Sequence, residues 1–284
     1  MKEALPAIRN GWVRTALFLL AYIVCIVLIG SVLGVLHITN KVELSIETMD
    51  SLTIRLLVLN ALVSLLLVSV FRVFIDRKSV PSLGLLPFTK DALLGLLVSI
   101  AILGCGTLIL FANGNLHWLD VSFDAGNFFL MMAIILLAAF GEEMVFRGYI
   151  LGNLLSVTDK FSALAISALL FALTHISNHG INIIALFNLF VAGLFLGLNY
   201  IFTKNLWFAV FFHFGWNFLQ GPVLGYEVSG LNINSVLETE LSGNELLTGD
   251  KFGFEGSILS GVLMLIAGML LYLAFGKRKQ NCQP

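Results

Sequence analysis

Three charged side chains, Glu142, Glu143 and Arg147, interrupt a long apolar stretch near the middle of the sequence. Placing one ionised side chain at the centre of a membrane costs roughly 2.5–3.5 kcal/mol on insertion scales. Three such residues within six positions must therefore neutralise each other or carry out chemistry.

The spacing divides these charges into a pair and a single group. Glu143 and Arg147 are four residues apart, share one helix face, and have the acid N-terminal to the base, the favourable order for an ion pair. Glu142 is rotated by about 100° from Glu143 around a helix axis. It is the carboxylate expected to lack a partner, and such a group can act as a general base or acid.

Two later apolar segments also carry polar side chains. His175 follows Phe171 by one helical turn, and His213 and Asn217 lie four residues apart on one face. A lone histidine in a span more often bonds a neighbouring helix than catalyses a reaction. Histidines inside spans are nevertheless rare and usually face the interior of the bundle.

The depth of each polar group along its helix determines whether these groups can meet. At ~1.5 Å of rise per residue, His175 lies about 22 Å from Lys160. If the charged helix continues to about Leu155, Glu142 lies about 20 Å from the same side and Arg147 is buried with it. The polar side chains then share one level, which predicts a site made by Glu142, Glu143, Arg147, His175, His213 and Asn217.

Composition sets the class of protein. Of 284 residues, 58% are hydrophobic and 12% charged, and the mean hydropathy is +0.97, which is typical of a polytopic membrane protein. The net charge is −1, with no basic block longer than Lys277-Arg278-Lys279, so we expect no nucleic-acid partner. The partner that this composition implies is the lipid bilayer.

Eight apolar segments approach the ~20 residues that a membrane span needs. The distribution of Lys and Arg favours eight spans with both termini in the cytoplasm. We therefore predict an all-α transmembrane bundle of about eight spans, with three spans in residues 1–125 and five spans, which carry the predicted site, in residues 126–284. The segments are about 12–36, 52–74, 92–111, 127 through the charged motif, 161–174, 181–201, 206–220 and 258–275.

The longest non-cytoplasmic loop, residues 221–256, is acidic and contains several glycines. It could form an ordered or partly re-entrant cap. We favour the simpler interpretation, a solvated loop.

The polar positions also match a known pattern. The sequence Glu142-Glu143-x-x-x-Arg147-Gly148, then Phe171-x-x-x-His175, then His213-x-x-x-Asn217, resembles the three ordered motifs of the CPBP family. This family contains the CAAX proteases and bacteriocin-processing enzymes, and is also called Abi. The resemblance covers about residues 131–220 and the final span.

The resemblance implies an intramembrane endopeptidase. By position, Glu142 would activate water with His175 as its partner, and His213 and Asn217 would stabilise the oxyanion. Glu143 and Arg147 would shape the site.

The resemblance also favours a metalloprotease, in which Glu142, His175 and His213 would hold one divalent ion such as zinc. The sequence contains no His-Glu-x-x-His helix, and the same residues could activate water without a metal. The sequence is therefore compatible with both a zinc-dependent and a metal-free activation of water.

The implied substrate is either a prenylated CAAX protein or a leader or bacteriocin precursor peptide, reached from the cytoplasmic side or laterally from the bilayer. The expected location is a multi-pass position in a membrane, the plasma membrane if the source is prokaryotic.

Two other classes of function are compatible with buried charge. One is a non-enzymatic immunity or scaffold protein that binds a peptide or membrane partner. The other is an ion-coupled transporter with a glutamate relay, which is disfavoured because no internal repeat is apparent.

Overall fold

A computed structural model of the protein describes residues 5–39 and 51–280, with the backbone alone for 36–39, 51 and 276–280. The side chains of Lys277, Arg278 and Lys279, and all of Cys282, lie outside this description. The described chain is mostly helical, as predicted. Its longer helices are α1 (Gly11–Thr39), α2 (Ser51–Val70), α3 (Asp91–Ala112), α4 (Ala125–Glu143), α6 (Lys160–Leu173), α7 (Ile183–Thr203), α8 (Trp207–Phe218) and α10 (Ile258–Gln280).

Within the described residues, six helices are long and apolar enough to cross a membrane: residues 11–35, 52–75, 91–112, 125–154, 183–203 and 258–275. The other two predicted spans form shorter helices. α6 has 14 residues, and α8 has 12 before a π-helical turn at Leu219–Val223.

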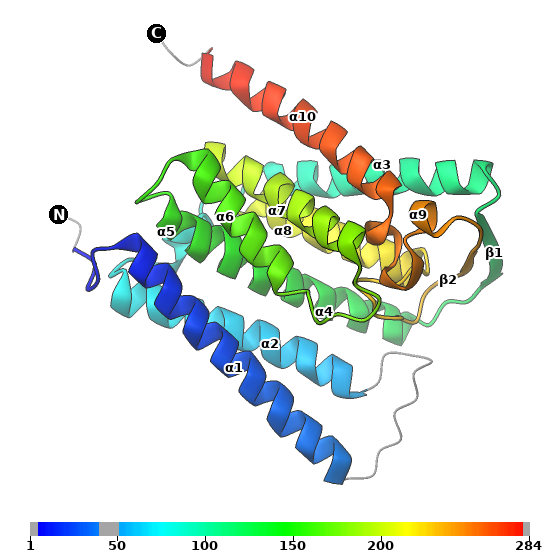
Figure 1. The fold of residues 1–284 in the computed structure, drawn as a ribbon, viewed down its shortest axis with the longest axis horizontal. Helices are drawn as coiled ribbons and strands as arrows, with labels where there is room; N and C mark the ends of the chain where they lie inside the picture. The colour runs from blue at the N-terminus through cyan, green and yellow to red at the C-terminus, as the bar shows by residue number, and fades with distance from the viewer. Residues whose placement is uncertain (1–4, 40–50, 281–284) are drawn as a thin grey trace.

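The helices form a bundle around α4, α7 and α8 (Figure 1). α2 and α8 pack on α4, α3 packs along α8, and α6 and α10 pack on α7. The C-terminal ends of α1 and α10 diverge from the bundle in opposite directions (Figure 1), and both helices expose many apolar side chains, as lipid-facing helices do. Because α3 packs on α8, the N-terminal helices are joined to the core, and the division at residue 125 stays a prediction.

α4 continues beyond Glu143 as one rod of 30 residues, 125–154. From Met144 to Leu151 the winding is π-helical, and the short helix α5 (Gly152–Leu154) completes the rod. All eight residues of the π-helical segment are buried. The predicted extension of the fourth helix to about Leu155 is confirmed, and Arg147 is buried as expected.

One end of the bundle is rich in basic side chains. Asp76 accepts hydrogen bonds from Arg14 at 2.9 Å and from Arg72 at 2.8 Å, which links α1 to the chain after α2. Lys204, which ends α7, lies in the same cavity as both arginines. We call this region the basic end.

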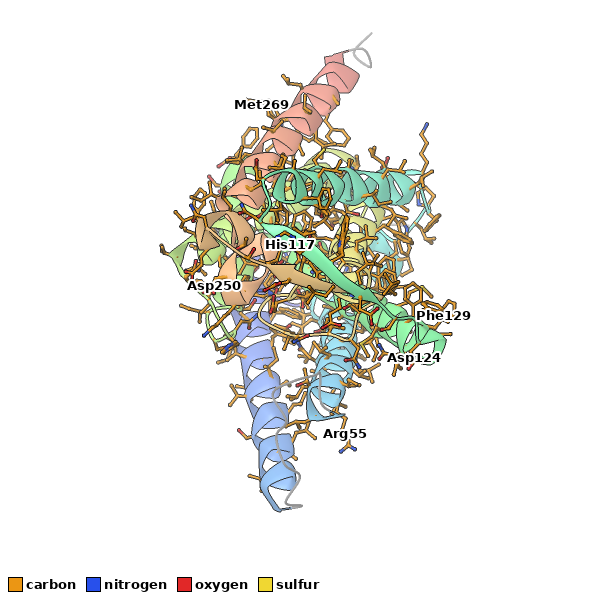
Figure 2. The ribbon with its side chains drawn as sticks, turned by 90° about the vertical axis from the view of Figure 1, so that its right-hand side faces the viewer. Arg55, His117, Asp124, Phe129, Asp250 and Met269 are labelled. Carbon is orange, nitrogen blue, oxygen red and sulfur yellow. The ribbon has the colours of Figure 1, made fainter. Side chains whose placement is uncertain are left out.

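The opposite end carries an ordered cap, so the expectation of a solvated loop at 221–256 is wrong. β2 (Leu237–Leu241) pairs antiparallel with β1 (Leu116–Val121), and α9 (Glu245–Thr248) follows. Figure 2 views the molecule from this side. The cap is ordered because Tyr226, Phe252 and Phe254 are buried within it.

Hydrogen bonds from side chains of α3 and α7 hold the cap against the bundle. The hydroxyl groups of Tyr226 and Thr107 in α3 are 2.9 Å apart. The Asn188 amide in α7 donates to the carbonyl oxygens of Glu255 and Ser257 at 2.8 and 2.6 Å. Asn188 therefore stabilises the chain just before α10, and it also lines a small cavity beside His175 and His213.

The α3–α8 contact leads to a first prediction. A Cβ added at Gly95 would collide with the Phe208 carbonyl oxygen and the Phe212 amide, whereas one added at Gly104 of the same helix would meet nothing within 4 Å. We expect Gly95→Ala to cost about 1–3 kcal/mol, because overpacking forces helices apart. Gly104→Ala should leave the unfolding temperature equal or slightly raised. Thermal unfolding in detergent checks this, and equal effects at the two glycines would contradict the close α3–α8 packing.

Candidate active site

Glu143 and Arg147 form a buried ion pair inside the bundle. Arg147 Nη1 donates to Glu143 Oε1 at 2.8 Å, and the two side chains are 1% and 0% exposed. Arg147 Nη2 also donates to the Gly193 carbonyl of α7 at 3.3 Å, and its guanidinium lies 4.4 Å from the Phe171 ring centroid. The predicted pairing of these two residues is confirmed.

His213 of α8 contacts the same carboxylate. Its Nδ1 lies 2.9 Å from Glu143 Oε1. An ionised carboxylate only accepts hydrogen bonds, so Nδ1 carries the proton, and in a neutral imidazole Nε2 is left as an acceptor. Glu143 therefore orients His213 and holds α8 against α4.

Glu142 is the free carboxylate, as the spacing predicted. Its Oε2 is buried and has no hydrogen-bond partner among the described residues. It lies 4.0 Å from His213 Nε2, beyond hydrogen-bond distance. The carboxylate is thus held close to an imidazole without being neutralised by a cation.

His175 lies in the turn that follows α6. Its Nδ1 is 2.9 Å from the Phe171 carbonyl oxygen. Because a carbonyl only accepts, Nδ1 carries the proton here too, and Nε2 of the neutral ring is available for chemistry. The Phe171 ring packs against both histidines, with ring centroids 4.8 Å from His175 and 6.2 Å from His213.

Two cavities meet at these side chains. The larger, of about 480 Å³, is lined by Glu142, His175, His213 and Asn217, together with apolar side chains of α1, α2 and α4. We call it the site cavity. A smaller one, of about 40 Å³, shares His175, His213 and Asn217 and is closed by the cap and α10. Three segments distant in sequence thus present their polar groups to one space, while the roles assigned to them stay predictions.

The sequence analysis missed Glu255. This cap residue lines the smaller cavity with the two histidines, and its carboxylate accepts a hydrogen bond from the Ser229 hydroxyl. Burial raises the pKa of Glu255, which lies before α10 and outside the predicted spans. The only available signal was the aromatic residue Phe254 beside it, which indicates a buried segment within an acidic loop.

The proposed zinc ligands do not form a metal site in this arrangement. Among the described residues, no three His, Cys, Asp or Glu side chains converge as a metal would require. The donor set at Glu142, His175 and His213 therefore does not fit the three-ligand zinc centre considered above. Zinc binding stays a prediction, and the chemistry below has no metal step.

Comparison with known proteins agrees with this geometry. Residues 124–219 match the family model described as type II CAAX prenyl endopeptidase Rce1-like. No curated protein and no solved structure matches the chain.

The matched segment runs from the start of α4 to the end of α8 and contains all six predicted site residues. Over these residues the chain is similar to the type II CAAX prenyl endopeptidases, which supports the predicted resemblance to the CPBP family of intramembrane proteases. The match supports a protease that acts on a peptide or protein in a membrane setting, and the apolar helices agree with a multi-pass membrane protein.

The buried pair generates a stability prediction. Arg147→Met leaves the Glu143 carboxylate buried without its cation, which costs about 3–5 kcal/mol in comparable pairs. The double variant Glu143→Gln with Arg147→Met should regain much of this loss, because no buried charge is stranded. Glu142→Gln should be nearly neutral. Thermal unfolding of the purified proteins tests this, and a loss at Glu142 as large as at Arg147 would contradict the division of roles.

Glu255 generates a pH-dependent prediction. The folded protein binds its proton more tightly than the unfolded chain, so stability falls as pH rises from the unfolded pKa to the folded pKa. Glu255→Gln removes this penalty and should raise the unfolding temperature near pH 7.5 by about 2 °C, less near pH 4. The exposed residue Glu240 provides the matched control, Glu240→Gln, with no such dependence. An equal shift at both pH values would contradict the burial of a charged Glu255.

Proposed function

We propose that the protein hydrolyses a peptide bond in a membrane-associated peptide or protein, with Glu142 as the general base on water. The observation that carries this proposal is the buried Oε2 of Glu142, which has no hydrogen-bond partner among the described residues and lies at a cavity that His175, His213 and Asn217 also line. A carboxylate in this state can take a proton from a water molecule.

In the first step, Glu142 takes a proton from water and the hydroxide oxygen bonds to the carbonyl carbon of the substrate. His175 assists through Nε2, because its Nδ1–H is already donated to the Phe171 carbonyl. The carbonyl oxygen becomes an oxyanion. The reaction then needs hydrogen-bond donors directed at that oxygen.

Asn217 and His213 supply these donors. The Asn217 amide has two N–H groups, and His213 donates from Nε2 when it is protonated. The Glu143 carboxylate accepts from His213 Nδ1 in either state and stabilises the imidazolium, while Arg147 pairs with the same carboxylate. The Glu143–Arg147 pair affects the reaction through its contact with His213.

In the second step, the tetrahedral intermediate collapses and the carbon–nitrogen bond breaks. The departing amine takes the proton that Glu142 received from water, which returns Glu142 to its carboxylate form. The products are a carboxylate and an amine. A prenylated CAAX tail and a leader or bacteriocin precursor are both compatible with this chemistry.

The apolar wall of the site cavity supports a membrane-embedded substrate. It includes Ile26 of α1, Leu57 of α2, and Met131, Ile134 and Ile135 of α4. A flexible chain passing along this wall would place apolar side chains in a matching environment.

Activity of single variants tests the mechanism. Glu142→Gln should reduce turnover by about 10²–10⁴-fold, the range of a lost general base. Asn217→Ala should reduce it by about 10²–10³-fold, the range of a lost oxyanion donor. Glu240→Gln, an exposed carboxylate of the cap, should keep full activity.

The measurement uses membranes from cells that lack the protein. Purified enzyme is added, and new peptide termini are quantified by mass spectrometry. If Glu142→Gln produces the same termini at the same rate while remaining folded, the proposed mechanism is wrong. The protein would then act by binding a partner without cleavage.

A further inference from the structure

The site cavity extends from Glu142 mainly toward the cap. Its lining on α4 comprises Met131, Ile134, Ile135, Ala138 and Glu142, which lie on one helix face between Glu142 and the N-terminus of α4. That N-terminus follows β1 at the cap. Among the residues of the rod 125–154 that line the cavity, Phe146 alone lies beyond Glu142 toward the basic end, by one helical turn.

The other lining segments agree with this direction. They include residues 174–179 in the turn after α6 and Val228, Ser229, Leu231 and Ile233 of the cap. α2 contributes Leu57 and Asn60 from its first half, and that helix begins at Ser51, on the cap side (Figure 1). The cavity thus lies between the cap, α1, α2 and α4.

Toward the basic end the bundle is closed. Beyond Phe146, which lines the site cavity, Tyr149, Ile150, Leu151 and Leu154 on the continuation of α4 are each 0% exposed. A separate cavity of about 340 Å³ lies at that end, lined by Arg14, Arg72 and Lys204 among others, and it shares no residue with the site cavity. Packed side chains therefore separate the basic end from Glu142.

Charge distinguishes the two ends of the molecule. The cap carries Glu227, Glu238, Glu245 and Asp250 around a surface hollow, with Lys251 as its basic side chain. Asp124 and Asp250 are labelled on this side in Figure 2. Segments rich in Lys and Arg stay in the cytoplasm, so the basic end faces the cytoplasm and the cap faces away from it.

We propose that substrates reach Glu142 from the cap side, so that the protein cleaves membrane-anchored peptides whose scissile segment lies on the non-cytoplasmic face. This inference rests on the proposed function and differs from the expected cytoplasmic entry. The apolar segment of the substrate lies along α1, α2 and α4, and the polar residues that flank it lie beneath the cap. A C-terminal tail presented in the cytoplasm meets the closed face and is not a substrate.

Cysteine accessibility tests the direction of entry independently of catalysis. In a variant whose Cys25, Cys105 and Cys282 are replaced by serine, single cysteines are introduced as Ala138→Cys or Ser177→Cys. Ala138 lies one turn from Glu142, and Ser177 lines the same cavity nearer the cap. Ser156→Cys, at an exposed position of the basic end, is the matched control.

A small, charged, membrane-impermeant methanethiosulfonate is applied to intact cells and, separately, to inverted vesicles. We expect Ala138→Cys and Ser177→Cys to be modified at least tenfold faster in intact cells, and Ser156→Cys at least tenfold faster in inverted vesicles. Gel filtration confirms that each variant is folded.

Modification of Ala138→Cys mainly in inverted vesicles, or in neither preparation, would overturn the proposal. So would modification of the Ser156→Cys control from outside, because the assumed orientation would then be wrong. These rates do not depend on turnover. A protein that labels as expected but cleaves nothing would contradict the proposed function and leave the direction of entry supported.

Discussion

The buried contact among Arg147, Glu143 and His213 is the interaction on which the site depends. A charge inside a membrane bundle is stable only when its partners are fixed, and here each partner comes from a different element. α4 supplies the ion pair, α7 the Gly193 carbonyl, and α8 the imidazole. The π-helical winding from Met144 to Leu151 carries Arg147 within a fully packed segment. Because the pair neutralises itself, Glu142 beside it can remain ionisable and unpartnered.

This arrangement separates two tasks that adjacent carboxylates would otherwise share. Glu143 is saturated on Oε1 by two donors and has a structural and orienting role. Glu142, one residue earlier, is rotated toward the cavity and has no donor among the described residues. The difference arises from helix geometry rather than from residue type. A carboxylate that transfers protons stays free of a cation more easily when the neighbouring carboxylate, here Glu143, already binds Arg147.

Local features of the site could be predicted from the sequence, and tertiary ones could not. The Glu143–Arg147 pair follows from a spacing of four, and the length of α4 follows from its apolar run. The bond between His213 and Glu143 joins residues 70 apart and depends on how α8 packs on α4. Glu255 was missed for the same reason: an acidic loop residue gives no sign of folding back over the bundle until the buried Phe252 and Phe254 are known.

The short length of α6 affects how water reaches a hydrolytic site inside a bilayer. Its 14 residues rise about 21 Å, roughly 9 Å less than the thickness of a typical hydrocarbon core. A helix of this length that begins at one face of the hydrocarbon core would end inside it, where the backbone after Thr174 needs polar partners. Asn178 donates to the Ser229 carbonyl of the cap, and His175 bonds within its own turn. If Glu142 activates water as we propose, the short α6 leaves the reacting water only a short apolar distance to cross.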